Sequence, residues 1–212
     1  MAEARDSSSN GSVRSNGKDS FEAPTKERPA PGAWRMGMFL FLVSLTILFL
    51  ASIVATLIIR YRTGAWPPPG MPPPPSRLWI STAILAVSGV TMQWAVVSAR
   101  RNRKDSLKAA MILTTLLAVA FLISQLLNWW HWVGQSATIR SSLYAYLFYV
   151  LTGLHAAHVI GGLIPLIVVT VNSWYGRYSG VFYTGVKQCA IYWHFLGVVW
   201  ALLFTVILVT AR

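Results

Sequence analysis

Charged side chains are scarce in this sequence of 212 residues: 11% of the residues are charged, whereas 55% are hydrophobic. Soluble domains carry about 25% charged residues. Beyond residue 33 the only carboxylate is Asp105. This shortage excludes the paired carboxylates of acid–base catalysis and a Ser-His-Asp triad from the apolar part of the chain. It also argues against an autonomous ion pump, which needs ionisable groups at mid-membrane.

Cysteine is almost absent as well. The one cysteine, Cys189, excludes a disulfide within the chain and any metal site built from several thiolates. A lone cysteine in an apolar run behaves as a small hydrophobic residue, and we interpret Cys189 in this way. Of the four histidines, the three that lie in apolar runs remain as candidates for metal or haem ligation.

The apolar residues occur in five long runs that contain no Asp, Glu, Lys or Arg. About 20 residues of helix cross a hydrocarbon core of about 30 Å, and a backbone in lipid must satisfy its own hydrogen bonds. The sequence therefore predicts an all-α integral membrane protein, folded as a bundle of five transmembrane helices. The predicted helices are residues 36–59, 78–99, 109–130, 143–172 and 188–211.

The positions of the 18 Lys and Arg residues predict how these helices are oriented. Most of them fall on one side of the membrane, in the segment up to residue 35, in residues 100–108 and in residues 173–187. Cytoplasmic loops carry the excess of basic residues. We therefore expect a cytoplasmic N-terminus and an outside C-terminus. The net charge of +12 serves topology in this interpretation, so no nucleic acid partner is expected.

The first 33 residues differ in composition from the rest of the chain. Residues 1–33 are rich in Ser, Gly, Asn, Pro and charge, which predicts a disordered polar cytoplasmic tail before a membrane domain of residues 34–212.

Trp and Tyr residues, Trp132 among them, gather near the helix ends, as in interfacial aromatic belts. The segment RRNRKDSLK (100–108) is an expected contact for anionic lipid headgroups. Its basic residues are Arg100, Arg101, Arg103, Lys104 and Lys108.

The fourth apolar run contains two histidines. His155 and His158 are three residues apart and therefore share one side of a helix. Beside them Gly153, Ala157 and Gly161 form a ladder of small residues with a spacing of four. Such ladders let helix backbones approach closely in membranes. We expect this ladder to pack against another helix, with the histidines beside the contact.

The third membrane histidine, His194, lies in the fifth run with Trp193 and Trp200. We interpret the three histidines as interhelical hydrogen-bonding and packing residues. A b-type cytochrome anchor is the alternative, with His155 and His194 as axial haem ligands. A metal site of three histidines is disfavoured because the bundle offers no anionic ligand. A channel or transporter would need a polar path, and only isolated Gln, Ser and Thr residues are present.

Several stretches resemble the cytochrome c oxidase subunit III family. LTGLHAAHVIGG (151–162) is similar to the family's LTGxHxxHVxxG, and YWHFLGVVW (192–200) is similar to its YWHFxDxVW. RMGMFLFLVSL (35–45) resembles the GMWxFLxSE segment, and WPPPGMPPP (66–74) resembles the W-P-P-x-G loop. The resemblance runs through residues 34–212 in the right order, and it matches the short form of the family, which has five helices.

The resemblance implies a non-catalytic accessory subunit of a haem–copper terminal oxidase in a bacterial cytoplasmic membrane. Such a subunit carries no cofactor. It packs on catalytic subunit I, meets other oxidase subunits, holds phospholipids and supports assembly and stable turnover. Two departures are notable: Leu45 and Gly197 stand where the family commonly has glutamate and aspartate. These losses make a subunit III-like partner of a nitric oxide reductase a further alternative.

Overall fold

Five helices make up the fold of the computed structural model, which describes residues 33–64, 66–176 and 183–211, with side chains from residue 36. They are α1 (Ala33–Arg62), α2 (Leu78–Arg100), α3 (Lys104–Gly134), α4 (Leu143–Trp174) and α5 (Thr184–Thr210). All five are long and apolar enough to span a membrane. The predicted all-α bundle of five transmembrane helices is confirmed. The predicted tail lies outside the described residues, apart from Ala33.

Most helices extend beyond the apolar runs that predicted them. The shortest, α2, has 23 residues, which corresponds to about 35 Å. The 31 residues of α3 begin in the basic segment at Lys104 and end at Gly134. An apolar run marks the part of a helix inside the hydrocarbon, whereas backbone hydrogen bonds continue through the polar interface. Between α2 and α3 the chain turns at Asn102, whose φ of 54° suits asparagine.

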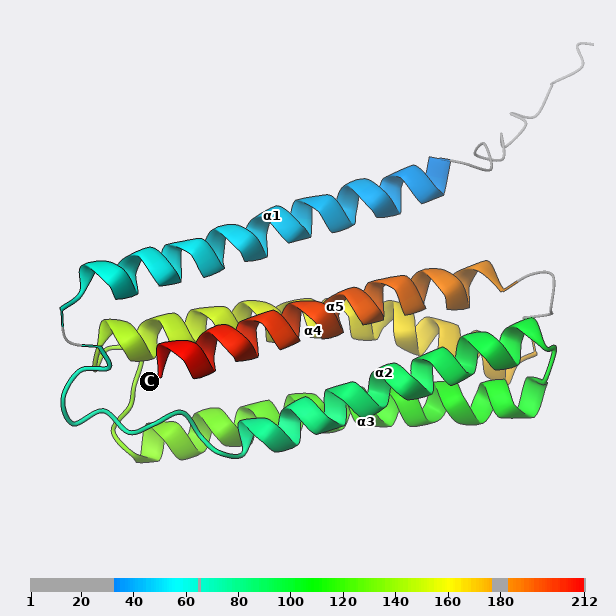
Figure 1. Ribbon diagram of the computed structural model, residues 1–212. Coiled ribbons are helices and arrows are strands. Elements are labelled where there is room, and N and C mark those ends of the chain that lie inside the picture. The colour runs from blue at the N-terminus through cyan, green and yellow to red at the C-terminus, as the bar shows by residue number, and fades with distance from the viewer. Residues whose placement is uncertain (1–32, 65, 177–182, 212) are drawn as a thin grey trace, which may run out of the picture.

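Helices α2 to α5 form an antiparallel four-helix bundle. In it α2 packs on α3 and α5, and α4 packs on the same two helices. Helix α1 lies against α4 and α5 and is the least buried of the five. Figure 1 shows its N-terminal half diverging from the bundle. The α2–α3 turn and the end of α4 lie at one end of the molecule, and the C-terminus lies at the other.

Small hydroxyl side chains join the helices inside the bundle. Thr91 of α2 meets Thr114 of α3 at 2.8 Å, and Thr115 of α3 meets Thr170 of α4 at 3.0 Å. Membrane helices use such side chains as interhelical hydrogen-bonding groups because water does not compete there. These contacts fix how α3 lies between its two neighbours.

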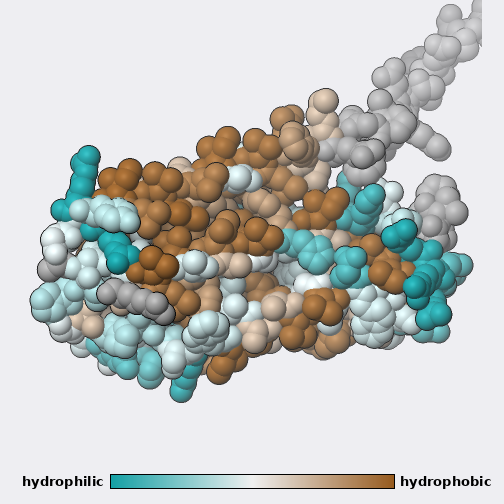
Figure 2. Space-filling model, viewed as in Figure 1, coloured by the Kyte–Doolittle hydropathy of each residue, from teal (hydrophilic) through white to brown (hydrophobic). Residues whose placement is uncertain are grey.

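The surface has a broad apolar band between two polar ends, as Figure 2 shows. Trp130 and Trp174 are exposed near helix ends, in agreement with an interfacial belt. Trp132 is different, because it is fully buried and its indole N–H donates to the carbonyl of Pro73 at 3.2 Å. The expectation that Trp132 belongs to the belt is therefore wrong. Its side chain holds the loop of residues 66–74 against the bundle.

Candidate functional site

His155 lies at the centre of the bundle, fully buried among aromatic rings from three other helices. Its ring centroid is 4.9 Å from that of Trp200, 5.8 Å from that of Phe121 and 6.3 Å from that of Phe49. Neither ring nitrogen has a hydrogen-bond partner in the described part of the chain. The expected interhelical hydrogen bond is therefore not made by His155, which acts here as a packing residue.

His158 is half-buried and bonds within its own helix. Its Nδ1 donates to the carbonyl of Leu154 at 2.7 Å, and its ring meets Phe49 edge-on at 5.1 Å. The link to another helix runs through its backbone, since the hydroxyl of Tyr192 donates to the carbonyl of His158 at 2.9 Å. Tyr192 thereby ties α5 to α4 at the level of the histidines.

Only the first residue of the small-residue ladder packs on another helix, since a Cβ on Gly153 would lie 3.9 Å from the ring of Trp129 on α3. Ala157 and Gly161 are exposed, and a Cβ built on Gly161 meets nothing within 4 Å. The close contact lies one residue further, where a Cβ on Gly162 would stand 2.5 Å from Cε1 of Tyr192. Our expectation for Gly161 is corrected accordingly. Ala157 and Gly161 instead line a cleft of about 450 Å³ between α1, α4 and α5.

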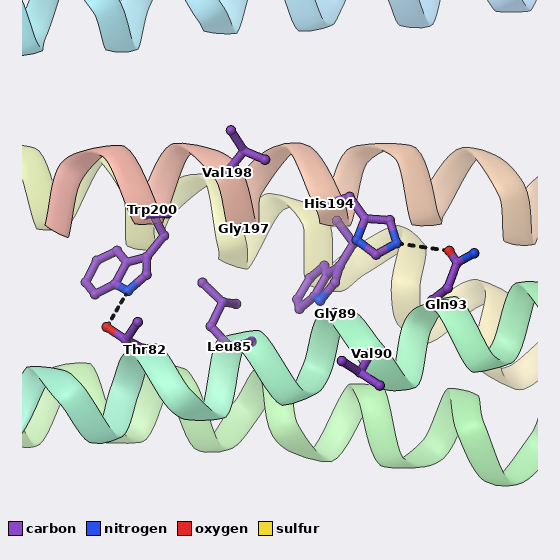
Figure 3. Close-up of a pocket in the computed structure, with 12 residues that line it drawn as sticks. Thr82, Leu85, Gly89, Val90, Gln93, His194, Gly197, Val198 and Trp200 are labelled. Atoms are coloured by element: carbon purple, nitrogen blue, oxygen red, sulfur yellow. Dashed lines mark hydrogen bonds between the residues drawn. The ribbon is translucent and has the colours of Figure 1, made fainter. Parts of the chain in front are cut away.

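A second hollow, which we call the lateral groove, opens between α2 and α5 and has a volume of about 470 Å³. Figure 3 shows Gly89 on α2 and Gly197 on α5, with the ring of His194 reaching toward Gln93. The His194 Nε2 lies 3.3 Å from Gln93 Oε1, and both side chains are exposed. His194 is thus the membrane histidine whose side chain makes an interhelical hydrogen bond.

The inner wall of the lateral groove is formed by two buried tryptophans. The indole N–H of Trp193 donates to the hydroxyl of Ser88, and that of Trp200 donates to the hydroxyl of Thr82, each at 3.0 Å. Both acceptors lie on α2. Two indoles and a histidine of α5 therefore bind α2 along one line, which makes the groove wall rigid.

A haem between His155 and His194 does not fit this arrangement. His155 is enclosed by rings that include Trp200 of α5 itself, whereas His194 points away to α2. A porphyrin held by both would have to displace that tryptophan. Among the described residues, no three His, Cys, Asp or Glu side chains come together in a way that could hold a metal ion.

Comparison with known proteins shows the family to which this chain belongs. The family model described as cytochrome c oxidase subunit III matches residues 26–211. The chain belongs to the cytochrome c oxidase subunit III family. The cytochrome c oxidase subunit 3 of Synechocystis is 34% identical over 179 residues, which cover 84% of this chain and 76% of the relative. That of Thermostichus vulcanus is 30% identical, with 84% and 87% covered.

The resemblance reaches beyond bacteria. The cytochrome c oxidase subunit 3 of Mus musculus is 31% identical over 180 residues, which cover 80% of this chain and 67% of the relative. The names of these relatives refer to a cytochrome c oxidase. They give no support to a partner of nitric oxide reductase or to a b-type cytochrome anchor.

Leu45 and Gly197, the two positions where the resemblance implies carboxylates in the family, have different surroundings. Leu45 of α1 is buried in the hydrophobic core. Gly197 of α5 lines the lateral groove, and a Cβ there would meet nothing within 4 Å. One of these two positions is therefore filled by a packed side chain, and the other borders open space beside His194.

The basic segment lies at the turn between α2 and α3 and is exposed from Arg100 to Lys104. Lys108 differs, because its ammonium lies 5.9 Å from the ring centroid of Trp174 on α4. The four outer bases are free to meet headgroups, whereas Lys108 also contacts the bundle.

Proposed function

We propose that this chain is a non-catalytic accessory subunit of a haem–copper oxidase, which packs on the catalytic subunit and supports its assembly and stable turnover. The observation that carries the proposal is the match of the subunit III family model to residues 26–211. The relatives in Synechocystis and Thermostichus vulcanus support a place in a bacterial cytoplasmic membrane.

The residues of the chain support a role without chemistry of its own. Reduction of oxygen by a haem–copper oxidase requires a set of histidine ligands for haem and copper. This chain has four histidines, and each of the three in the membrane is committed to packing or to a hydrogen bond within the protein. The described membrane spans contain no carboxylate within their apolar parts to relay protons.

The orientation of the subunit follows from its charges. The basic turn from Arg100 to Lys104 is exposed at the end of the molecule where α4 also ends. Since positive residues stay on the cytoplasmic side, we place this end in the cytoplasm and the C-terminus outside. The same turn would attract anionic phospholipid headgroups, with about 1 kcal/mol for each basic residue near the surface.

Co-purification from native membranes tests this function. Tagged full-length chain, extracted in a mild detergent, should recover a haem–copper oxidase catalytic subunit in near-equal amount. When a harsher detergent separates the two, the haem spectrum should follow the catalytic subunit. Recovery without any oxidase subunit, or a Soret band that stays with the separated chain and is abolished by His155→Ala, would refute the proposal.

A further inference from the structure

The polar pair of the lateral groove lies at a depth where lipid provides no hydrogen bonds. His194 is ten residues from the start of α5 at Thr184, which places it about 15 Å along the helix. Gln93 is seven residues before the end of α2 at Arg100, about 10 Å from that end. Both side chains are nevertheless exposed. Polar groups inside a membrane face protein partners or water-filled cavities because lipid tails leave them unsatisfied.

The pair does not satisfy itself. Because Gln93 Oε1 accepts, His194 Nε2 carries the proton in this contact, and His194 Nδ1 is left as an acceptor with no partner among the described residues. In the same part of the chain no acceptor meets the amide N–H groups of Gln93. Gly89 leaves room for about a methyl group next to this acceptor, since a Cβ there would be in van der Waals contact with His194 Nδ1 at 3.8 Å.

The groove beside this pair is suited to the packing of a further helix. Gly89 of α2 and Gly197 of α5 line the groove without a side chain, and small residues of this kind let a further helix approach closely in a membrane. Its inner wall is fixed by Trp193 and Trp200 through their hydrogen bonds to α2. An acyl chain could fill the volume, but it would leave the acceptor and the donors of the polar pair without partners.

We infer that the lateral groove docks a transmembrane helix of another subunit of the oxidase. That helix places an apolar side chain between Gly89 and Gly197 and turns a hydrogen-bonding side chain toward His194 and Gln93. The inference rests on the proposed function and adds to it the face, α2 with α5, by which the chain meets its complex.

Substitution at Gly197 tests the docking face. Gly197→Leu places a branched side chain in the groove, at a position where a Cβ meets nothing within 4 Å. Gly161→Leu is the matched control, since Gly161 is equally open on α4. From membranes with equal amounts of each variant, Gly197→Leu should reduce the recovered oxidase subunits at least tenfold, and Gly161→Leu should not. Gln93→Leu, which keeps the volume, should reduce recovery several-fold.

Photo-crosslinking identifies the occupant of the groove. A benzophenone amino acid at Val90 or Val198, both exposed on the groove rims, should label a transmembrane peptide of an oxidase subunit. The same probe at Ile160, exposed on α4, should label no such peptide. Labelling of phospholipid alone, together with full recovery by Gly197→Leu, would overturn the inference and leave the proposed function standing. If Gly161→Leu rather than Gly197→Leu lost the oxidase subunits, the inference would also be overturned, and the contact would lie at the cleft between α1, α4 and α5. Failure of the unsubstituted chain to recover the oxidase would overturn both proposals.

Discussion

The contact between Gly162 and Tyr192 allows a quantitative test of the packing of α4 on α5. A methyl group at Gly162 would stand 2.5 Å from Cε1 and 3.1 Å from Cδ1 of Tyr192. The ring cannot move freely, because its hydroxyl donates to the carbonyl of His158 and its face stacks on Phe41 at 5.9 Å. Gly162→Ala must therefore displace a held ring or separate two helices.

The expected cost follows from these contacts. Overpacking a close-packed core costs about 1–3 kcal/mol, and loss of the tyrosine hydrogen bond adds about 1 kcal/mol. Alanine regains up to about 1 kcal/mol of helix propensity over glycine. Gly162→Ala should thus destabilise the folded chain by about 1–3 kcal/mol. Gly161→Ala, which gains the same propensity and meets nothing within 4 Å, should be neutral or slightly stabilising.

Reversible unfolding in mixed micelles, with a denaturing detergent as titrant, measures both variants under identical conditions. A double variant with Tyr192→Leu isolates the clash, because a smaller side chain should recover most of the loss caused by Gly162→Ala. Equal midpoints for the two alanine variants, or no coupling with Tyr192→Leu, would refute the assigned contact between α4 and α5.

Three further predictions concern other parts of the molecule. His155→Phe should leave the unfolding free energy within about 1 kcal/mol of the original, because the ring has no hydrogen bond to lose in the described chain. His155→Ala should cost about 2–5 kcal/mol through the cavity it opens, and a larger loss for Phe than for Ala would contradict the packing role. Trp200→Phe should cost more than Thr82→Val, because it also removes part of a buried ring. The double variant should lose about 1 kcal/mol less than the sum of the two, since both remove one shared hydrogen bond. Neutralising Arg100 and Arg103 to Gln should reduce the anionic phospholipid that co-purifies with the chain, and unchanged lipid content would exclude the headgroup contact.

The helices were predictable because a single physical requirement governs them. A backbone in hydrocarbon must be helical, so an uncharged run such as residues 143–172 indicates most of α4, which spans Leu143–Trp174. It was also predictable which connections share one end of the molecule, since alternating spans bring the α2–α3 turn and the end of α4 together. The extension of α3 from Lys104 was missed, because charge ends an apolar run without ending a helix.

The details of the site depended on rotation about the helix axes, which composition does not fix. Gly161 and Gly162 are adjacent in sequence, yet a turn of about 100° per residue puts one in a cleft and the other against Tyr192. His155 was expected to bond to another helix, but the residues around it proved to be aromatic. The pairing of His194 with Gln93 joins residues 101 positions apart, and no pattern within either helix indicated it.

The central claim, that the chain supports an oxidase without taking part in its chemistry, is tested most directly by comparing the enzyme with and without this subunit. Oxygen consumption and proton release are followed in vesicles, from the first turnovers until activity is lost. We predict a similar initial rate and a similar initial number of protons per electron in both, with a clearly shorter active lifetime when the subunit is missing. Immediate loss of proton pumping while electron transfer continues would contradict the account.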